Sequence, residues 1–467
     1  MSEKARLLKN TGLIAIGNFG AKMISFLLLP LYTSILDTAE YGEYDFIIAV
    51  SLFILPIVTM SLYEAMFRFI IEAGEKGKRF DEIITNVVIA ETIGIILMGM
   101  ICIPISMVYN AKIVWFVFAY VAASAYYLII NNILRGLGKI KEYAIVSSGK
   151  NILQLILNVI AVAVFRWGME GLVFSLCLSE MIAFIVVAIY SKIWKYINVQ
   201  LFSIKEIKPM ILYALPLIPN TLSSQIINIS DRIIITGFIN NSANGIYSIA
   251  YKFPNVIDTV YHFFYTAWSE SAARVYEKNE EEAHIYYKSL HKMMDNFMFA
   301  VIVLMISGMP ILFRIFIRGE YIDGFKYVPI LMLAMYFASM AKIYSGIFTA
   351  YKKTAVMATS TIIAAIVNII INIAFIKMYG LYAAAYSTLI SNILLMIIRK
   401  KMLESVIKFT IPISLVISRV LIVVLVFMLY DYNNLYKTAI SIVVCVVYTM
   451  LTNQKEIKSI LNKICRR

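Results

Sequence analysis

The sequence has 467 residues, of which 61% are hydrophobic and 15% are charged, and its mean hydropathy is +0.81. This composition excludes an ordinary soluble domain and indicates a membrane protein with many spans. The formal charge of +14 would otherwise suggest nucleic-acid binding, but cytoplasmic loops of membrane proteins collect Lys and Arg, so we expect no nucleic-acid partner.

Apolar runs, separated by charged or Gly/Pro-containing turns, predict an all-α fold with about fourteen transmembrane helices. The predicted spans are 9–36, 42–73, 79–109, 112–137, 141–167, 169–196, 206–240, 244–275, 284–318, 324–351, 353–379, 381–403, 410–431 and 433–452. Proline side chains predict kinks at Pro30, Pro56, Pro216, Pro219 and Pro254. No signal-peptide cleavage pattern precedes the first span, so we expect that span to be retained.

Short repeats divide these spans into two halves. Gly42-Glu43-Tyr44 and Gly245-Ile246-Tyr247 lie 203 positions apart, each at the start of an apolar span. A second pair of motifs agrees at offsets of 209 and 210: Gly171-Leu172 after Asn158, and Gly380-Leu381 after Asn368. We therefore predict pseudo-symmetric lobes at 1–200 (spans 1 to 6) and 201–408 (spans 7 to 12), followed at 409–467 by two extra helices and a basic tail.

The distribution of Lys and Arg predicts the orientation. With the N-terminus in the cytoplasm, 28 of the 42 Lys and Arg residues fall on inner segments, seven on outer turns and seven within spans. The positive-inside rule then places both termini in the cytoplasm. The four cysteines have no metal-type spacing, so neither a disulfide framework nor a metal site is predicted.

Charged residues within the spans are the candidate functional groups. Thr11, Ala15, Asn18, Lys22 and Ser25 recur at helical spacing, which places them on one face of the first span. A cation at mid-membrane costs about 2.5–3.5 kcal/mol, so Lys22 is expected to face a water-filled cavity or the interior of the bundle.

Further polar stripes occupy spans 2, 7 and 8, and together they predict a polar lumen. The predicted substrate-binding cations are Lys22, Arg68, Arg232, Lys252, Lys342 and Lys150. The predicted polar and aromatic lining residues are Asn18, Glu64, Asn228, Asp231, Tyr247, Tyr251, Asn255, Asp258, Tyr261 and His262.

Several of these charges also have structural interpretations. Arg68 could pair with Glu64 at i,i+4 or extend to the interface, and Asp231 and Arg232 could form a structural ion pair. Glu91 and Glu180, in the middle of spans 3 and 6, could be counter-ions or proton sites. Arg419 lies outside the repeated halves and is a weaker candidate for transport.

No enzyme constellation is present: the chain has three histidines and lacks GxSxG, P-loop and HExxH motifs. We therefore expect no catalytic residues and no cofactor. Unpaired cations inside two repeats instead suggest an anion carrier with alternating access. Lys and Arg suit a phosphate group, and Tyr side chains suit sugar rings.

The opening residues LLKNTGLIAIGNFGAKMISFLLLPLYTSILDTAEYGEYDF, then EAMFRF, Asp231-Arg232 and YKFPN at 251–255, resemble Wzx-type oligosaccharide flippases. These belong to the superfamily that also contains the lipid II flippase and the multidrug and toxin extruders. The resemblance covers essentially the whole chain in span count and pseudo-symmetry. It implies movement of undecaprenyl-diphosphate-linked oligosaccharide to the outer leaflet of the bacterial cytoplasmic membrane, with spans 1 to 6 rocking against 7 to 12.

The partners implied are the lipid-linked oligosaccharide, membrane lipids and other polysaccharide assembly proteins. The lumen cations Lys22, Arg68, Arg232 and Lys252 would hold the diphosphate or acidic sugars. Proton or sodium coupling stays open. The alternatives are lipid II flipping, an organic-cation antiporter of the same fold, for which a carboxylate-dominated lumen is expected, and a membrane glycosyltransferase or polymerase, against which the short outer turns argue.

Overall fold

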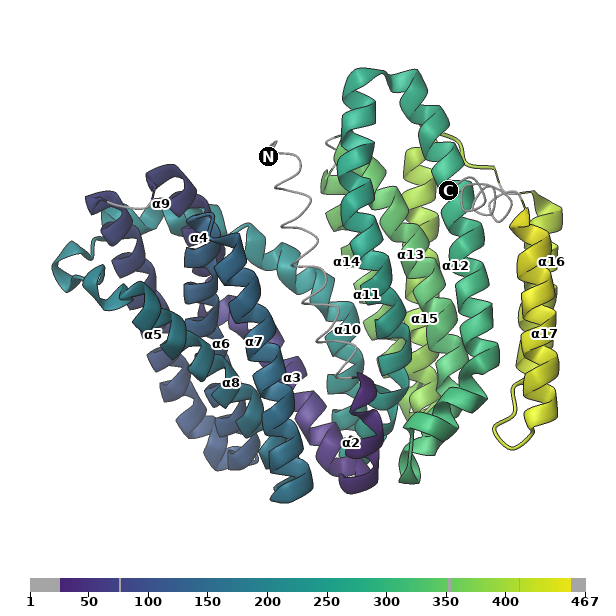
Figure 1. Ribbon diagram of the computed structural model, residues 1–467, viewed down its shortest axis with the longest axis horizontal. Helices are drawn as coiled ribbons and strands as arrows, with labels where there is room; N and C mark the ends of the chain where they lie inside the picture. Colours follow the sequence, from purple (N-terminus) through teal and green to yellow (C-terminus); the bar gives the residue numbers. More distant parts are fainter. Residues whose placement is uncertain (1–25, 75–76, 352–353, 411, 455–467) are drawn as a thin grey trace, which may run out of the picture. The chain divides into compact units, whose positions relative to one another are not determined.

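The computed structural model describes residues 26–74, 77–351, 354–410 and 412–454, and all regular elements within them are helices (Figure 1). In chain order the main helices are α2 (Leu29–Ile35), α3 (Thr38–Val58), α4 (Leu62–Ala73), α5 (Lys78–Val108), α6 (Ala111–Gly136), α7 (Ile140–Val159), α8 (Gly168–Ser191), α9 (Ile204–Ala214), α10 (Leu217–Phe238), α11 (Asn241–Lys278), α12 (Glu280–Phe316), α13 (Val328–Ala350), α14 (Thr354–Tyr379), α15 (Leu381–Leu403), α16 (Ile413–Leu429) and α17 (Leu435–Thr452).

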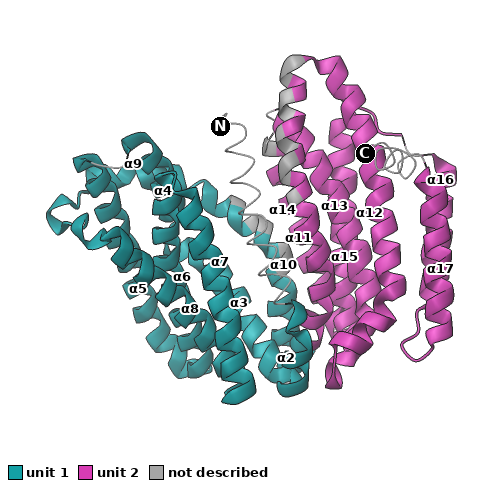
Figure 2. Cartoon of the chain, in the orientation of Figure 1, with its two compact units in different colours: residues 1–245 teal, residues 246–467 magenta. Residues whose placement is uncertain are grey.

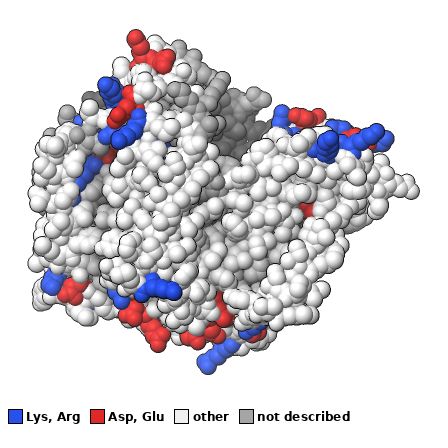
Figure 3. Space-filling model, turned by 180° about the vertical axis from the view of Figure 1, so that it is seen from behind, with Lys and Arg blue, Asp and Glu red and all other residues white. Residues whose placement is uncertain are grey.

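The helices have the length and apolarity of membrane spans. Ten helical segments of the described chain are long and apolar enough to cross a bilayer, and α16 is a shorter apolar helix. On the face in Figure 3, charged side chains gather towards the ends of the helices, and the band between them is largely uncharged. The prediction of an all-α membrane protein with many spans is thus confirmed.

The first compact unit comprises residues 1–245 (Figure 2). One apolar core of this unit joins α4, α5, α6, α8 and α9 around Met66, Ile84 and Ile130. A second joins α3, α5, α6 and α8 around Val117 and Val173. Helices α9 and α10, which we predicted to open the second lobe, pack against α4 and α3 of this unit.

The second compact unit comprises residues 246–467. Its most enclosed helix is α13, which packs against α12, α14 and α15. The C-terminal helices α16 and α17 pack against α12. The unit boundary at 245 reflects packing, whereas the predicted lobes 1–200 and 201–408 describe an internal repeat, and that division stays a prediction.

Two predicted spans are broken in the middle. Span 42–73 divides into α3 and α4, because Met60 and Ser61 adopt left-handed backbone angles, with φ of 49° and 51°. Span 206–240 divides at Pro216, the N-cap of α10. In contrast, α11 continues through Pro254. Pro30 lies in the first turn of α2, where its missing N–H removes no helical bond.

Candidate functional site: intramembrane charges and their partners

Arg232 of α10 is paired with a carboxylate of α3. Its Nε lies 2.6 Å from Oδ2 of Asp45, and both side chains are 12% exposed. Asp231 is itself buried, at 1% exposure. The pairing partly neutralises the charge of Arg232 before any substrate arrives.

The repeated Gly-x-Tyr segments meet where α3 and α11 begin. A Cβ atom on Gly42 would lie 1.8 Å from the carbonyl oxygen of Asn241, and one on Gly245 would lie 2.0 Å from that of Thr38. Asn244 closes the crossing, since its Nδ2 donates to the carbonyl oxygen of Gly42 at 2.8 Å. Only glycine fits at these two positions, so the first turns of α3 and α11 cross with their backbones in contact.

Lys150 of α7 has a carboxylate partner in unit 1. Its Nζ lies 3.4 Å from Oε1 of Glu180 on α8, and the two side chains are 13% and 6% exposed. Ser124 of α6 donates to the other carboxylate oxygen at 2.5 Å, and the ammonium lies 5.2 Å from the ring centroid of Tyr127. Glu180 is therefore a counter-ion, one of the two roles that the sequence allowed for it.

Arg68 lies in the middle of α4, and its side chain is exposed. It pairs with Glu72 at 2.9 Å, one turn further along, and not with Glu64; the side chains of Arg68 and Glu72 are 48% and 57% exposed. Glu64 lies in the first turn of α4 and is partly buried. Arg68 thus keeps a guanidinium that an incoming anion can reach.

Lys342 of α13 forms an ion pair with Asp258 of α11 in unit 2. The two side chains are 34% and 38% exposed, which makes this pair far more open than that of Lys150. One turn beyond Asp258, Tyr261 is buried, and its hydroxyl donates to the carbonyl oxygen of Ser339 at 2.8 Å. Helix α11 therefore presents a mixed charged and aromatic face towards α13.

The other predicted residues of α11 vary in exposure. Tyr247 is buried, Tyr251 and Lys252 are partly buried, and Asn255 and His262 are exposed. The rings of Tyr247 and Tyr251 are 5.9 Å apart. Lys22, Asn18 and the side chain of Asn228 lie outside the described residues.

Arg419 of α16 belongs to a buried cluster that the sequence did not predict. Its Nη1 donates to both carboxylate oxygens of Asp295 at 2.9 Å and to the hydroxyl of Tyr336 at 2.8 Å. Its Nη2 donates to Oδ1 of Asn296 at 2.9 Å, and the guanidinium lies 4.9 Å from the ring centroid of Phe299. Arg419 thus fixes α16 to α12 and α13.

A second buried arginine uses only neutral acceptors. Arg399, near the end of α15, is 6% exposed and donates to hydroxyls of Ser345, Ser360 and Thr361 at 2.7, 3.1 and 2.9 Å, and to the carbonyl oxygen of Ala341 at 3.1 Å. Its partners lie 38 to 58 positions away, so no local pattern could reveal them.

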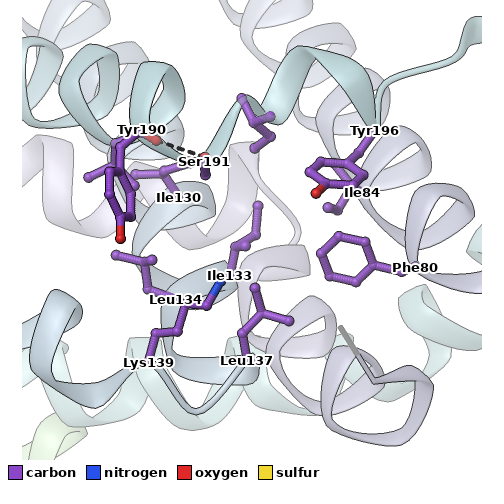
Figure 4. Close-up of a pocket in the computed structure, with 12 residues that line it drawn as sticks. Phe80, Ile84, Ile130, Ile133, Leu134, Leu137, Lys139, Tyr190, Ser191 and Tyr196 are labelled. Atoms are coloured by element: carbon purple, nitrogen blue, oxygen red, sulfur yellow. Dashed lines mark hydrogen bonds between the residues drawn. The ribbon is translucent and has the colours of Figure 1, made fainter. Parts of the chain in front are cut away.

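A cavity of roughly 200 Å³ lies in unit 1 among α5, α6 and α8 (Figure 4). Its walls are mainly apolar, with Phe80, Ile133 and Leu134 among them, and Lys139 and Tyr190 add polar atoms. None of the predicted site residues lines it. The predicted site and this cavity are thus separate features.

The fold is similar to that of solved membrane transporters. The structure of a lipid II flippase, MurJ, in an inward closed conformation matches 96% of this chain and 99% of its own, with a TM-score of 0.76 and 16% identity. An inward-facing multidrug resistance MATE family transporter of the MOP superfamily matches 82% of this chain and 95% of its own, with a TM-score of 0.64 and 16% identity. At such identities the similarity defines the fold, which is that of a polytopic transporter.

The sequence places the chain within that class. A family model described as polysaccharide biosynthesis protein matches residues 7–269, more than half of the chain. The chain therefore belongs to this family, in agreement with the resemblance drawn from the opening residues. A search of curated proteins gives no match.

Proposed function

We propose that the chain is a flippase that moves undecaprenyl-diphosphate-linked oligosaccharide units from the inner to the outer leaflet of the bacterial cytoplasmic membrane. The observation that carries the proposal is the polysaccharide biosynthesis family match over residues 7–269, which supports a lipid-linked sugar as substrate. In this proposal both termini are cytoplasmic, and the protein works beside other polysaccharide assembly proteins without catalysing a covalent reaction.

The accessible cations supply the chemistry that such a substrate needs. Arg68 and Lys342 are about half and one-third exposed, so a diphosphate can reach them without first breaking into a packed core. An incoming diphosphate would compete with Asp258 for Lys342, and its higher charge favours the exchange. Lys22 and Lys252 remain predicted partners of the same headgroup.

Alternating access of the two lobes would carry the headgroup across while the lipid tail stays in the bilayer. An inside-negative potential drives this movement, because each negative charge moved outward gains about 2.3 kcal/mol per 100 mV. A diphosphate with roughly two charges gains about twice that, so no ATP is required.

Lipid II flipping is the second candidate, and the similarity to the lipid II flippase structure favours it. The MATE similarity keeps an organic-cation antiporter as the third. Proteoliposomes containing the full chain can be given each substrate in turn: an undecaprenyl-diphosphate oligosaccharide, lipid II and a fluorescent organic cation. We expect outward movement of the first at least about tenfold faster than of the others, a difference of about 1.4 kcal/mol in barrier. Preferred movement of either rival would replace the proposal.

A further inference from the structure

Among the described residues of unit 1, two glutamates are buried in the membrane helices, and they differ in their partners. Glu180 is held by Lys150 and Ser124. Glu91, in the middle of α5, is 0% exposed, and neither of its carboxylate oxygens has a hydrogen-bond partner within the described chain. The burial of the Glu91 carboxyl without a partner therefore needs an explanation, whereas the partners of Glu180 account for its burial.

Glu91 faces the break between α3 and α4. Here the backbone turns through two left-handed residues, Met60 and Ser61, and α4 begins at Leu62. The backbone N–H of Tyr63, in the first turn of α4, is close enough to the Glu91 carboxyl to interact with it. The hydroxyl of Tyr63 interacts electrostatically with both Glu91 and Glu64.

The surroundings of Glu91 contain no cationic partner in the described part of the chain. From α4 the titratable groups are Tyr63 and Glu64. From α6, Tyr126 contacts the neighbouring Thr92 at 3.1 Å. Neither α3 nor α9, which also pack on α5, brings a charged group into interaction with Glu91.

The buried carboxyl group of Glu91 is suited to bind a proton. An unpaired carboxylate away from water costs several kcal/mol, whereas the protonated acid has no net charge. A metal cation would meet the positive end of α4, and the described residues hold no group of three acidic, His or Cys side chains that could bind one. The left-handed backbone at Met60 and Ser61 is strained, which marks a segment that can rearrange.

We propose that Glu91 is a proton-binding site, filled and emptied through the break between α3 and α4. Uptake converts the Glu91 carboxylate and a hydronium ion into the carboxylic acid and water, and release reverses this step. Glu64, which is partly exposed and interacts with the same Tyr63 hydroxyl, is the outer end of this proposed route. Coupling of this proton to transport rests on the proposed flippase function, but proton binding itself does not.

Infrared difference spectra of the reconstituted full chain, recorded between acidic and alkaline buffer, test the binding site. We expect a buried carboxylic-acid band that disappears in Glu91→Gln and shifts in Glu91→Asp. The matched control is Glu180→Gln, which removes a buried but partnered carboxyl and should leave the band in place. A band that is unchanged in both Glu91 variants would overturn the proposed proton site. If Glu91→Gln fails to fold, the shift expected in Glu91→Asp still decides the test.

Flipping assays test the coupling separately. An imposed pH gradient should change the wild-type rate of lipid-linked oligosaccharide movement severalfold, and Glu91→Gln should abolish that response while still responding to membrane potential. A pH response that survives in Glu91→Gln would contradict the coupling. If wild type moves no lipid-linked oligosaccharide, the flippase proposal fails, while the infrared result still decides whether Glu91 binds a proton.

Discussion

Two cations of unit 2 show how burial separates structural from accessible charge. Arg419 is 10% exposed on its side chain, and its Nη atoms bind Asp295, Tyr336 and Asn296. Lys342 is 34% exposed and has one partner, Asp258, which is itself 38% exposed. A buried cation that binds side chains of two neighbouring helices can exchange partners only if the three helices unpack, whereas a pair that is about one-third exposed can exchange one carboxylate for another anion.

The largest loss of stability should come from substitutions in the buried cluster around Arg419. Arg419→Ala leaves Asp295 buried and uncompensated, so we expect a loss of about 3–5 kcal/mol in the free energy of unfolding. Thermal unfolding in detergent measures it as a lower Tm. The double variant Asp295→Asn/Arg419→Met should recover part of the loss, because no unpaired charge stays buried. An unchanged Tm in Arg419→Ala would show that the cluster does not fix α16.

Substitutions at the crossing of α3 and α11 should lower stability by a somewhat smaller amount. In Gly42→Ala the new Cβ would lie 1.8 Å from the carbonyl oxygen of Asn241, so the backbones must separate, at a cost of about 1–3 kcal/mol. Gly149 in α7 is the matched control, because a Cβ there meets nothing within 4 Å. Gly149→Ala should raise stability slightly, since alanine is the better helix former. Equal Tm values for the two variants would argue against a tight crossing.

The accessible pair of Lys342 and Asp258 should matter more for transport than for stability. Lys342→Gln removes an ion pair that is about one-third exposed and worth about 0–1 kcal/mol, so Tm should change little. If the lysine binds the diphosphate, the rate of flipping should fall about tenfold, equivalent to about 1.4 kcal/mol. Asp258→Asn, which frees the lysine, should keep or increase substrate affinity. A loss of stability without a loss of flipping would place Lys342 among the structural cations.

The smallest effect on stability is expected from the ion pair in the turn between α16 and α17. Lys437 Nζ lies 3.0 Å from Oδ2 of Asp431, and this bond, together with the backbone N–H of Asn433, holds the pKa of Asp431 below its usual value. The stabilisation is therefore present at neutral pH and is lost as pH falls through that lowered pKa. Lys437→Ala should leave flipping unchanged, and its Tm should converge with that of wild type in acid. A clear loss of flipping would give this turn an unexpected role.

The helices were predictable from the sequence because the membrane imposes a minimum apolar length on each span. The break at Pro216 followed from the missing proline N–H, whereas Pro56 lies inside α3 and the break between α3 and α4 comes after it. The left-handed conformation of Met60 and Ser61 could not be predicted, since neither residue type favours it.

The partners of the charges were much less predictable. Arg68 has carboxylates four positions away on both sides within α4, Glu64 and Glu72, and the structure pairs it with Glu72. Arg232 has a neighbour of opposite charge in the chain, yet pairs with Asp45, 187 positions away. Pairing depends on which helices pack together, and a single sequence does not contain that information.

The central claim is that cations in this chain carry an anionic lipid-linked sugar outward. Its most direct test is the initial rate of outward movement of a fluorescent undecaprenyl-diphosphate oligosaccharide in proteoliposomes, for wild type, Lys22→Gln and Lys252→Gln. We predict movement by wild type and a loss of at least about tenfold in each folded variant. If wild type moved no lipid-linked sugar but exported organic cations in exchange for protons, the claim would be contradicted.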